Sequence, residues 1–73
     1  MAIVEVRTEI TGNVWKVLRV AADAVAEDEP ILILESMKME IPVSAPEDGT
    51  VVEILVEEGD VVTEGSVVAR IEV

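Results

Sequence analysis

The chain has 73 residues, no cysteine, no histidine and a net charge of −11 at pH 7. Disulfide bonds, zinc clusters built on cysteine and histidine, and Ser-His or Cys-His catalysis are therefore excluded. Because phosphate contacts need clustered lysine and arginine, the negative charge also argues against nucleic-acid binding and against attraction to an anionic membrane.

Hydrophobic residues make up 51% of the chain, and valine and isoleucine dominate them. Such β-branched residues favour strands over helices, so we predict one all-β domain covering residues 1–73. No run approaches the roughly 18 apolar residues that span a bilayer. The N-terminus also lacks the basic region that precedes the apolar stretch of a signal peptide. We therefore predict a cytoplasmic location.

The predicted elements are short strands punctuated by turns that contain glycine, proline or aspartate. In chain order, the strands cover residues 14–20, 31–35, 40–43, 50–56 and 67–72. The turns cover residues 21–23, 27–30, 57–60 and 64–66. Only residues 21–29 could form a helical turn, which Pro30 would end.

Two segments of the chain repeat each other. Residues 12–35 align with residues 49–72 without a gap, so that Gly12 meets Gly49, Asp23 meets Asp60 and Glu35 meets Glu72. A valine-rich chain supplies matched valines by chance, but matched glycines and acidic residues are poorly explained that way. Two similar halves built of short strands predict a flattened barrel or sandwich of two small sheets with pseudo-two-fold symmetry.

The repeat also makes a prediction about backbone conformation. Ala22 and Asp28 stand where the second copy has Gly59 and Gly65. If these turns need a positive φ, Asp28 tolerates it and Ala22 is strained. Trp15, the only aromatic residue, aligns with Val52, which favours a packing role in the core or on a sheet face over contact with a partner.

Between the two copies lies a predicted hairpin, residues 36–40. The strand that ends at Glu35 enters it and the strand that begins at Glu40 leaves it, so Met37 and Lys38 occupy a two-residue turn. Such type I′ turns need a positive φ at both positions and normally contain Asn, Asp or Gly. Met-Lys breaks this rule, and a broken local rule points to a functional constraint.

The hairpin residues Glu35-Ser36-Met37-Lys38-Met39-Glu40 are similar to the attachment motif of the biotinyl/lipoyl carrier family. The stretches 49–51 and 58–65 also resemble the second half of that family. The resemblance covers residues 12–72 and is closest to the short stand-alone attachment proteins. It implies a flattened barrel of two four-stranded antiparallel sheets, without the thumb insertion of bacterial acetyl-CoA carboxylase carriers.

The resemblance also implies a function. Lys38 is the residue that a biotin protein ligase modifies, and Glu35, Ser36, Met37, Met39 and Glu40 form the motif that the ligase recognises. The resulting biotin arm moves activated CO₂ between biotin carboxylase and carboxyltransferase subunits. The chain is then a monomeric carrier and not itself an enzyme.

Two other functions stay open at this point. The first is a lipoyl carrier, or one that accepts either group, although lipoylated members of the family more often have Asp-Lys-Ala where this chain has Met37-Lys38-Met39. The second, of another class, is an unmodified β-module that acts in assembly. Whether Lys38 carries an added group separates this module from both carriers.

Overall fold

The computed structural model describes residues 2–73, and Met1 lies outside the described residues. Eight strands are found there, and no helix, so the prediction of an all-β fold is confirmed. The strands are β1 (Ile3–Arg7), β2 (Gly12–Val17), β3 (Ala24–Val25), β4 (Pro30–Ser36), β5 (Met39–Ser44), β6 (Gly49–Ile54), β7 (Val61–Val62) and β8 (Val67–Glu72). Residues 21–29 contain the short strand β3 in place of a helical turn.

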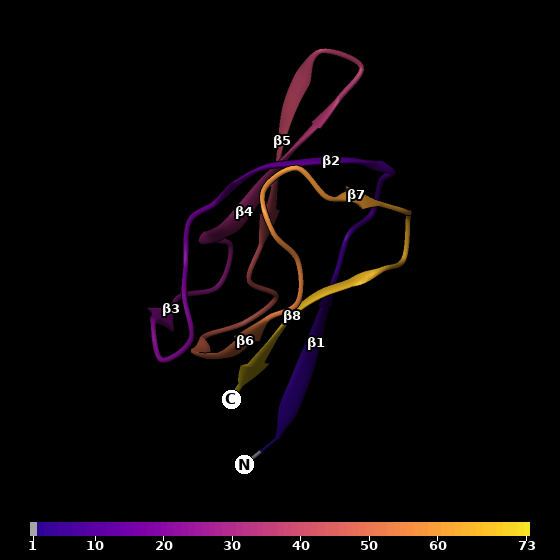
Figure 1. Ribbon diagram of the computed structural model, residues 1–73. Helices are drawn as coiled ribbons and strands as arrows, with labels where there is room; N and C mark the ends of the chain where they lie inside the picture. Colours follow the sequence, from indigo (N-terminus) through magenta and orange to yellow (C-terminus); the bar gives the residue numbers. More distant parts are fainter. Residues whose placement is uncertain (1) are drawn as a thin grey trace.

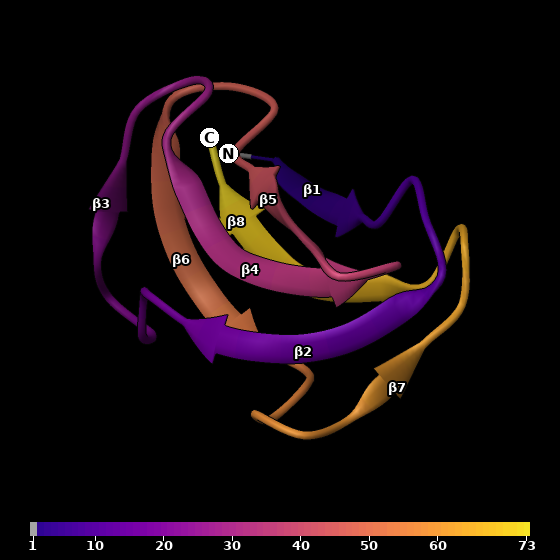
Figure 2. The same ribbon diagram turned by 90° about the horizontal axis from the view of Figure 1, so that it is seen from above.

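The strands form two four-stranded antiparallel sheets, as predicted. One sheet has the order β1-β8-β6-β3 and the other the order β5-β4-β2-β7. Figure 2 shows the long strands of both sheets curving around a common interior. The molecule is elongated, with extents of 36 × 18 × 18 Å, and the β4–β5 hairpin projects at one end while both termini lie at the other (Figure 1).

The core shows that the two halves are related by a pseudo-two-fold axis. Every buried residue has a buried counterpart 37 positions away in the chain. The seven pairs are Val6/Val43, Thr8/Ala45, Val14/Val51, Val25/Val62, Ile31/Val68, Leu32/Ala69 and Leu34/Ile71. The symmetry therefore extends beyond the aligned residues 12–35 and 49–72, because strand β1 is the counterpart of strand β5.

The four turns adopt the backbone conformation that the repeat predicts. Ala22 and Asp28 have φ values of 79° and 69°, and Gly59 and Gly65 have values of 96° and 88°. The hydrogen bonds repeat as well, since the amides of Ala22 and Gly59 each donate at 2.8 Å to the carbonyl of a core valine in the opposite half. Ala22 is thus the strained member of its pair.

We expect the variant Ala22→Gly to be more stable than the wild type by about 1 kcal/mol, because glycine adopts a positive φ without steric cost. The matched variant is Gly59→Ala, since an added Cβ there meets no atom within 4 Å and adds only the backbone strain. It should lose about the same free energy of unfolding. Urea midpoints of the two variants measure both changes, and shifts of the same sign would contradict the interpretation.

Of the two roles predicted for Trp15, packing in the core is wrong. Its side chain is 41% exposed, and its counterpart Val52 is 42% exposed. Both residues lie where the pairing register shifts, between Val14 and Lys16 in one half and at the equivalent place in the other. A bulge leaves one residue unpaired and redirects its side chain. Trp15 therefore faces outward, with the Lys16 Nζ 5.3 Å from its ring centroid.

Candidate functional site

The β4–β5 hairpin ends in a tight turn with an unusual backbone. Pairing between the strands continues up to Ser36 and Met39, so only Met37 and Lys38 form the turn. Their φ values are 52° and 65°, which confirms the predicted positive φ at both positions. Two successive non-glycine residues in this conformation are sterically costly, and neither has the short polar side chain that offsets the cost. The turn is therefore less stable than one built from Asn, Asp or Gly, and it places Met37 and Lys38 at the tip of the hairpin.

The apolar side chains of the tip are open to solvent. Met37 is 90% exposed and Met39 is 58% exposed, although methionine is normally a core residue. Lys38 is exposed between them. Such flexible, polarizable side chains are suited to contact with a protein partner. The tip thus offers a primary amine flanked by two apolar contact surfaces.

Lys38 also differs from the three arginines of the chain. In the described part of the chain it takes part in no ion pair, whereas all three arginines have carboxylate partners. The arginine partners are Glu5 for Arg7, Glu29 for Arg19, and both Glu53 and Glu5 for Arg70. The hydrogen bond to Glu53 raises the pKa of Arg70, which keeps that cross-strand pairing charged. The Lys38 amine is therefore available for chemistry.

Two carboxylates flank the tip. Glu35 of β4 and Glu40 of β5 are exposed and lie directly opposite each other in the strand pair. Like charges in this position repel and destabilise the pairing. They give the stem of the hairpin a local negative charge, which favours an approaching surface of positive charge.

Ser36 differs from the other residues of the predicted recognition motif, because its side chain turns toward the body of the molecule. Its Oγ donates a hydrogen bond of 3.0 Å to the carbonyl oxygen of Thr11. Gly12 lies beside it, where an added Cβ would be 2.7 Å from the carbonyl oxygen of Glu35. Sequence reasoning missed Thr11 as part of the site. The matched glycines of the repeat were the available signal, since Gly49 packs in the same way against Glu72.

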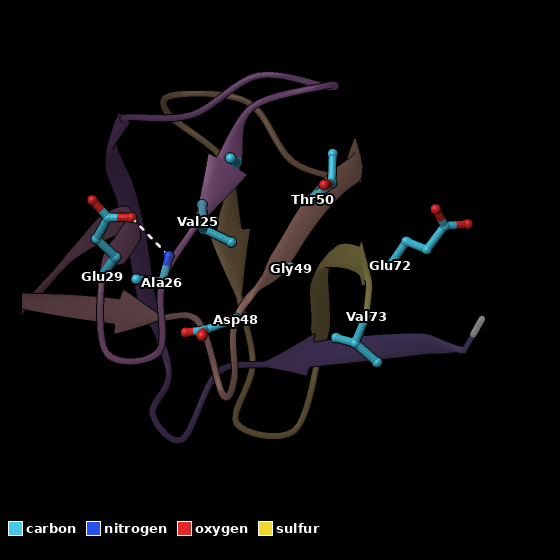
Figure 3. A pocket seen from close by; sticks show the side chains of 9 residues that line it. Val25, Ala26, Glu29, Asp48, Gly49, Thr50, Glu72 and Val73 are labelled. Atoms are coloured by element: carbon cyan, nitrogen blue, oxygen red, sulfur yellow. Dashed lines mark hydrogen bonds between the residues drawn. The ribbon is translucent and has the colours of Figure 1, made fainter.

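A broad hollow of the surface lies away from the tip. It has a volume of about 750 Å³ and is lined by Ala24, Val25, Ala26, Glu29, Asp48, Gly49, Thr50, Glu72 and Val73. Figure 3 shows Glu29 and Glu72 on opposite sides of it, with their carboxylates not converging on one point. Across residues 2–73, no group of three or more His, Cys, Asp and Glu side chains is placed to hold a metal ion. The hairpin tip is therefore the candidate site.

Residues 2–73 contain no helix that is long and apolar enough to cross a bilayer.

A family model that covers biotin and lipoyl attachment domains, with the description "Biotin-requiring enzyme", matches residues 2–71. The chain belongs to the biotinyl/lipoyl attachment family. This membership agrees with the two-sheet fold and with the lysine at the tip of the β4–β5 hairpin.

Relatives of this attachment domain include short proteins and parts of long ones. A biotin/lipoyl attachment protein of Bacillus subtilis is 44% identical over 66 residues, which are 90% of each chain. A biotinylated protein TB7.3 homolog of Mycobacterium leprae is 40% identical over 92% of this chain and 94% of its own. The dihydrolipoyllysine-residue acetyltransferase component of pyruvate dehydrogenase complex from Corynebacterium glutamicum is 40% identical over 82% of this chain but only 9% of its own.

A solved structure supports the same fold. The urea carboxylase of Kluyveromyces lactis superposes with a TM-score of 0.93 at 35% identity, over 99% of this chain. The matched region is 6% of that enzyme. The attachment domain therefore has the same architecture as one small part of a much longer carboxylase.

Proposed function

We propose that the chain is a biotin carboxyl carrier in which Lys38 accepts biotin from a biotin protein ligase. The observation that carries the proposal is the tip of the β4–β5 hairpin, where an exposed lysine with no ion-pair partner among residues 2–73 is held in a strained turn between two exposed methionines. Strain that brings no stability is expected at a site under functional selection.

The side chain of Lys38 fits covalent attachment through its amine. A lysine amine in water is almost entirely protonated at neutral pH, so the ligase has to deprotonate it and supply a biotin carboxyl activated with a leaving group. The amine nitrogen then forms the amide bond as the leaving group departs. The lysine charge disappears and the side chain becomes a long flexible arm. When attached, biotin supplies a ureido ring that accepts and releases carboxylate.

The carrier is in this proposal a substrate and a shuttle, with the catalysis supplied by its partners. These partners are the ligase, a biotin carboxylase and a carboxyltransferase. A tethered arm makes delivery effectively intramolecular, at effective concentrations on the order of millimolar. The net charge of −11 opposes self-association, which supports a monomer that binds each partner in turn.

Biotin is favoured over lipoate by the side chains on either side of Lys38. Met37 and Met39 place apolar surface where lipoylated members of the family more often have Asp and Ala, and one relative is a biotinylated protein homolog. Lipoate is the second candidate, because another relative is a dihydrolipoyllysine-residue acetyltransferase component. Parallel incubations with biotin ligase and biotin, and with lipoate ligase and lipoate, distinguish the two. We expect rapid modification with biotin ligase and biotin, and slow or no modification with lipoate ligase and lipoate.

The double variant Met37→Asp with Met39→Ala should move this preference toward lipoate. We expect biotin incorporation to slow by about ten-fold, which corresponds to about 1.4 kcal/mol of lost transition-state binding. Aspartate tolerates a positive φ better than methionine does, so the double variant should fold like the wild type. The measurement is the initial rate with each ligase, with circular dichroism as the control for folding. An unchanged ratio of the two rates would show that the methionines do not select the attached group.

A further inference from the structure

The turn at Met37 and Lys38 raises the question of what holds it in place. Neither residue favours a positive φ, and the two carboxylates of Glu35 and Glu40 repel each other just below them. Such a conformation persists only when the surrounding structure over-determines it. The hairpin projects from the body of the molecule, so the contacts that fix its direction must be made at its base (Figure 1).

In addition to the pairing of β4 with β2, three contacts surround Thr11 and Gly12 at the base of the hairpin. The Ser36 hydroxyl donates to the carbonyl oxygen of Thr11 at 3.0 Å, and the Glu64 amide donates to the Thr11 Oγ1 at 3.1 Å. Gly12, which has no Cβ, lets the backbone of Glu35 approach closely. Thr11 thus links the hairpin to the turn between β7 and β8.

A comparison of the two pseudo-symmetric halves shows which of these contacts occur in both halves and which occurs only at the hairpin. In the other half, Gly49 allows the same close approach and the Asp48 carboxylate accepts a hydrogen bond from the Glu27 amide at 2.8 Å, as Thr11 does from Glu64. These contacts are present twice. The counterpart of Ser36 is Val73, which has no hydroxyl and lines the hollow in Figure 3. The Ser36 hydrogen bond is therefore present once, in the half that carries the tip.

We infer that Ser36 is a positioning residue, whose hydrogen bond to Thr11 fixes the direction of the hairpin tip and so presents Lys38 to the ligase. The inference rests on the proposed function. It revises the sequence-based interpretation of Ser36 as a ligase contact, because its half-buried hydroxyl is already engaged within the chain. A neutral hydrogen bond shifts an equilibrium by a factor of roughly five, so its loss should lower the population of correctly oriented tips by up to that factor.

The variant Ser36→Val tests the inference, because valine already occupies the equivalent position 73 of the fold. We expect the KM for biotinylation to rise about five-fold with kcat unchanged, since a smaller fraction of molecules presents the tip. Hydrogen exchange of the amides of residues 35–40 should accelerate by a similar factor in the protein alone, with no ligase present. Ser36→Thr keeps the hydroxyl and should restore both values. Ser44→Val, at the other end of the same hairpin, is the matched control and should change neither.

The outcomes separate this inference from the proposed function. A wild-type chain that accepts no biotin would overturn the proposed function, whereas the exchange measurement would still report on the hydrogen bond. If the wild type is modified and Ser36→Val shows wild-type KM and wild-type exchange, Ser36 does not position the tip. A raised KM with unchanged exchange would instead make Ser36 a direct ligase contact and overturn the inference.

Discussion

We expect the variant Lys38→Arg to accept no biotin and to keep the wild-type fold. Arginine keeps the positive charge and most of the length of the side chain, but its guanidinium stays protonated and cannot act as the amine nucleophile. Because Lys38 is exposed and has no ion-pair partner among residues 2–73, its replacement removes no packing contact. Mass spectrometry after incubation with ligase measures the incorporation, and thermal unfolding checks the fold.

The chain supplies its own control for this experiment, since Lys16 is the only other lysine. Lys16 lies on strand β2, where its ammonium sits over the ring of Trp15. Lys16→Arg retains a cation in that position and should accept one biotin at the wild-type rate. Biotin found on Lys38→Arg, or lost from Lys16→Arg, would show that the attachment site is not Lys38.

Truncating a core residue of either half should bring the whole domain close to unfolding. Leu34 and Ile71 are pseudo-symmetric counterparts, and both are completely buried. Leu→Ala or Ile→Ala at such sites costs about 2–5 kcal/mol, and a domain of this length is stable by only about 4–11 kcal/mol. We expect Leu34→Ala and Ile71→Ala to lower the urea midpoint by similar, large amounts. The fluorescence of Trp15 and circular dichroism both follow the transition.

A substitution at the surface serves as the control for the loss of stability expected of the two core variants. Val20 is 64% exposed, so Val20→Ala should change the free energy of unfolding by no more than about 0.5 kcal/mol. If Leu34→Ala unfolds at the wild-type urea midpoint, the Leu34 side chain does not stabilise the core as its complete burial predicts. If Leu34→Ala and Ile71→Ala differ by several kcal/mol, the two halves do not share the core equally.

Much of the fold could be predicted because the chain repeats itself. The aligned glycines, aspartates and glutamates predicted the two-sheet symmetry, and the positions of Gly59 and Gly65 predicted the positive φ of Ala22 and Asp28. Strand β8 begins and ends where predicted, at residues 67–72. Strand β2 was predicted too late in the chain, because its apolar pattern continues past Val17 after the backbone has left the sheet.

Other features of the fold could not be predicted, because the sequence pattern that would indicate them is too short or lies outside the aligned segments. Strands β3 and β7 have two residues each, which is too few for any alternation of apolar and polar side chains to be recognised. Strand β1 lies outside the aligned segment, although Val4 and Val6 match Ile41 and Val43 at the same spacing of 37 residues. The outward position of Trp15 depends on a bulge, and pairing register is not visible in a single sequence.

The site was predicted in part for the same reason. Met37 and Lys38 could be placed at the tip because the repeat brackets them and because their residue types are wrong for the turn they form. The role of Thr11 could not be predicted, because its contact with Ser36 joins residues 25 positions apart through a backbone carbonyl. Any residue type supplies such a carbonyl, so the only trace in the sequence is the neighbouring Gly12, which matches Gly49 in the repeat.

The intact mass of the wild-type chain after incubation with biotin ligase and biotin shows whether Lys38 carries biotin. We expect a mass increase of one biotin, which peptide mapping places on Lys38. A folded chain whose mass does not change would show that Lys38 is not a biotin attachment site. Modification by lipoate ligase would then identify a lipoyl carrier, and failure with both ligases would leave an unmodified interaction module with the attachment-domain fold.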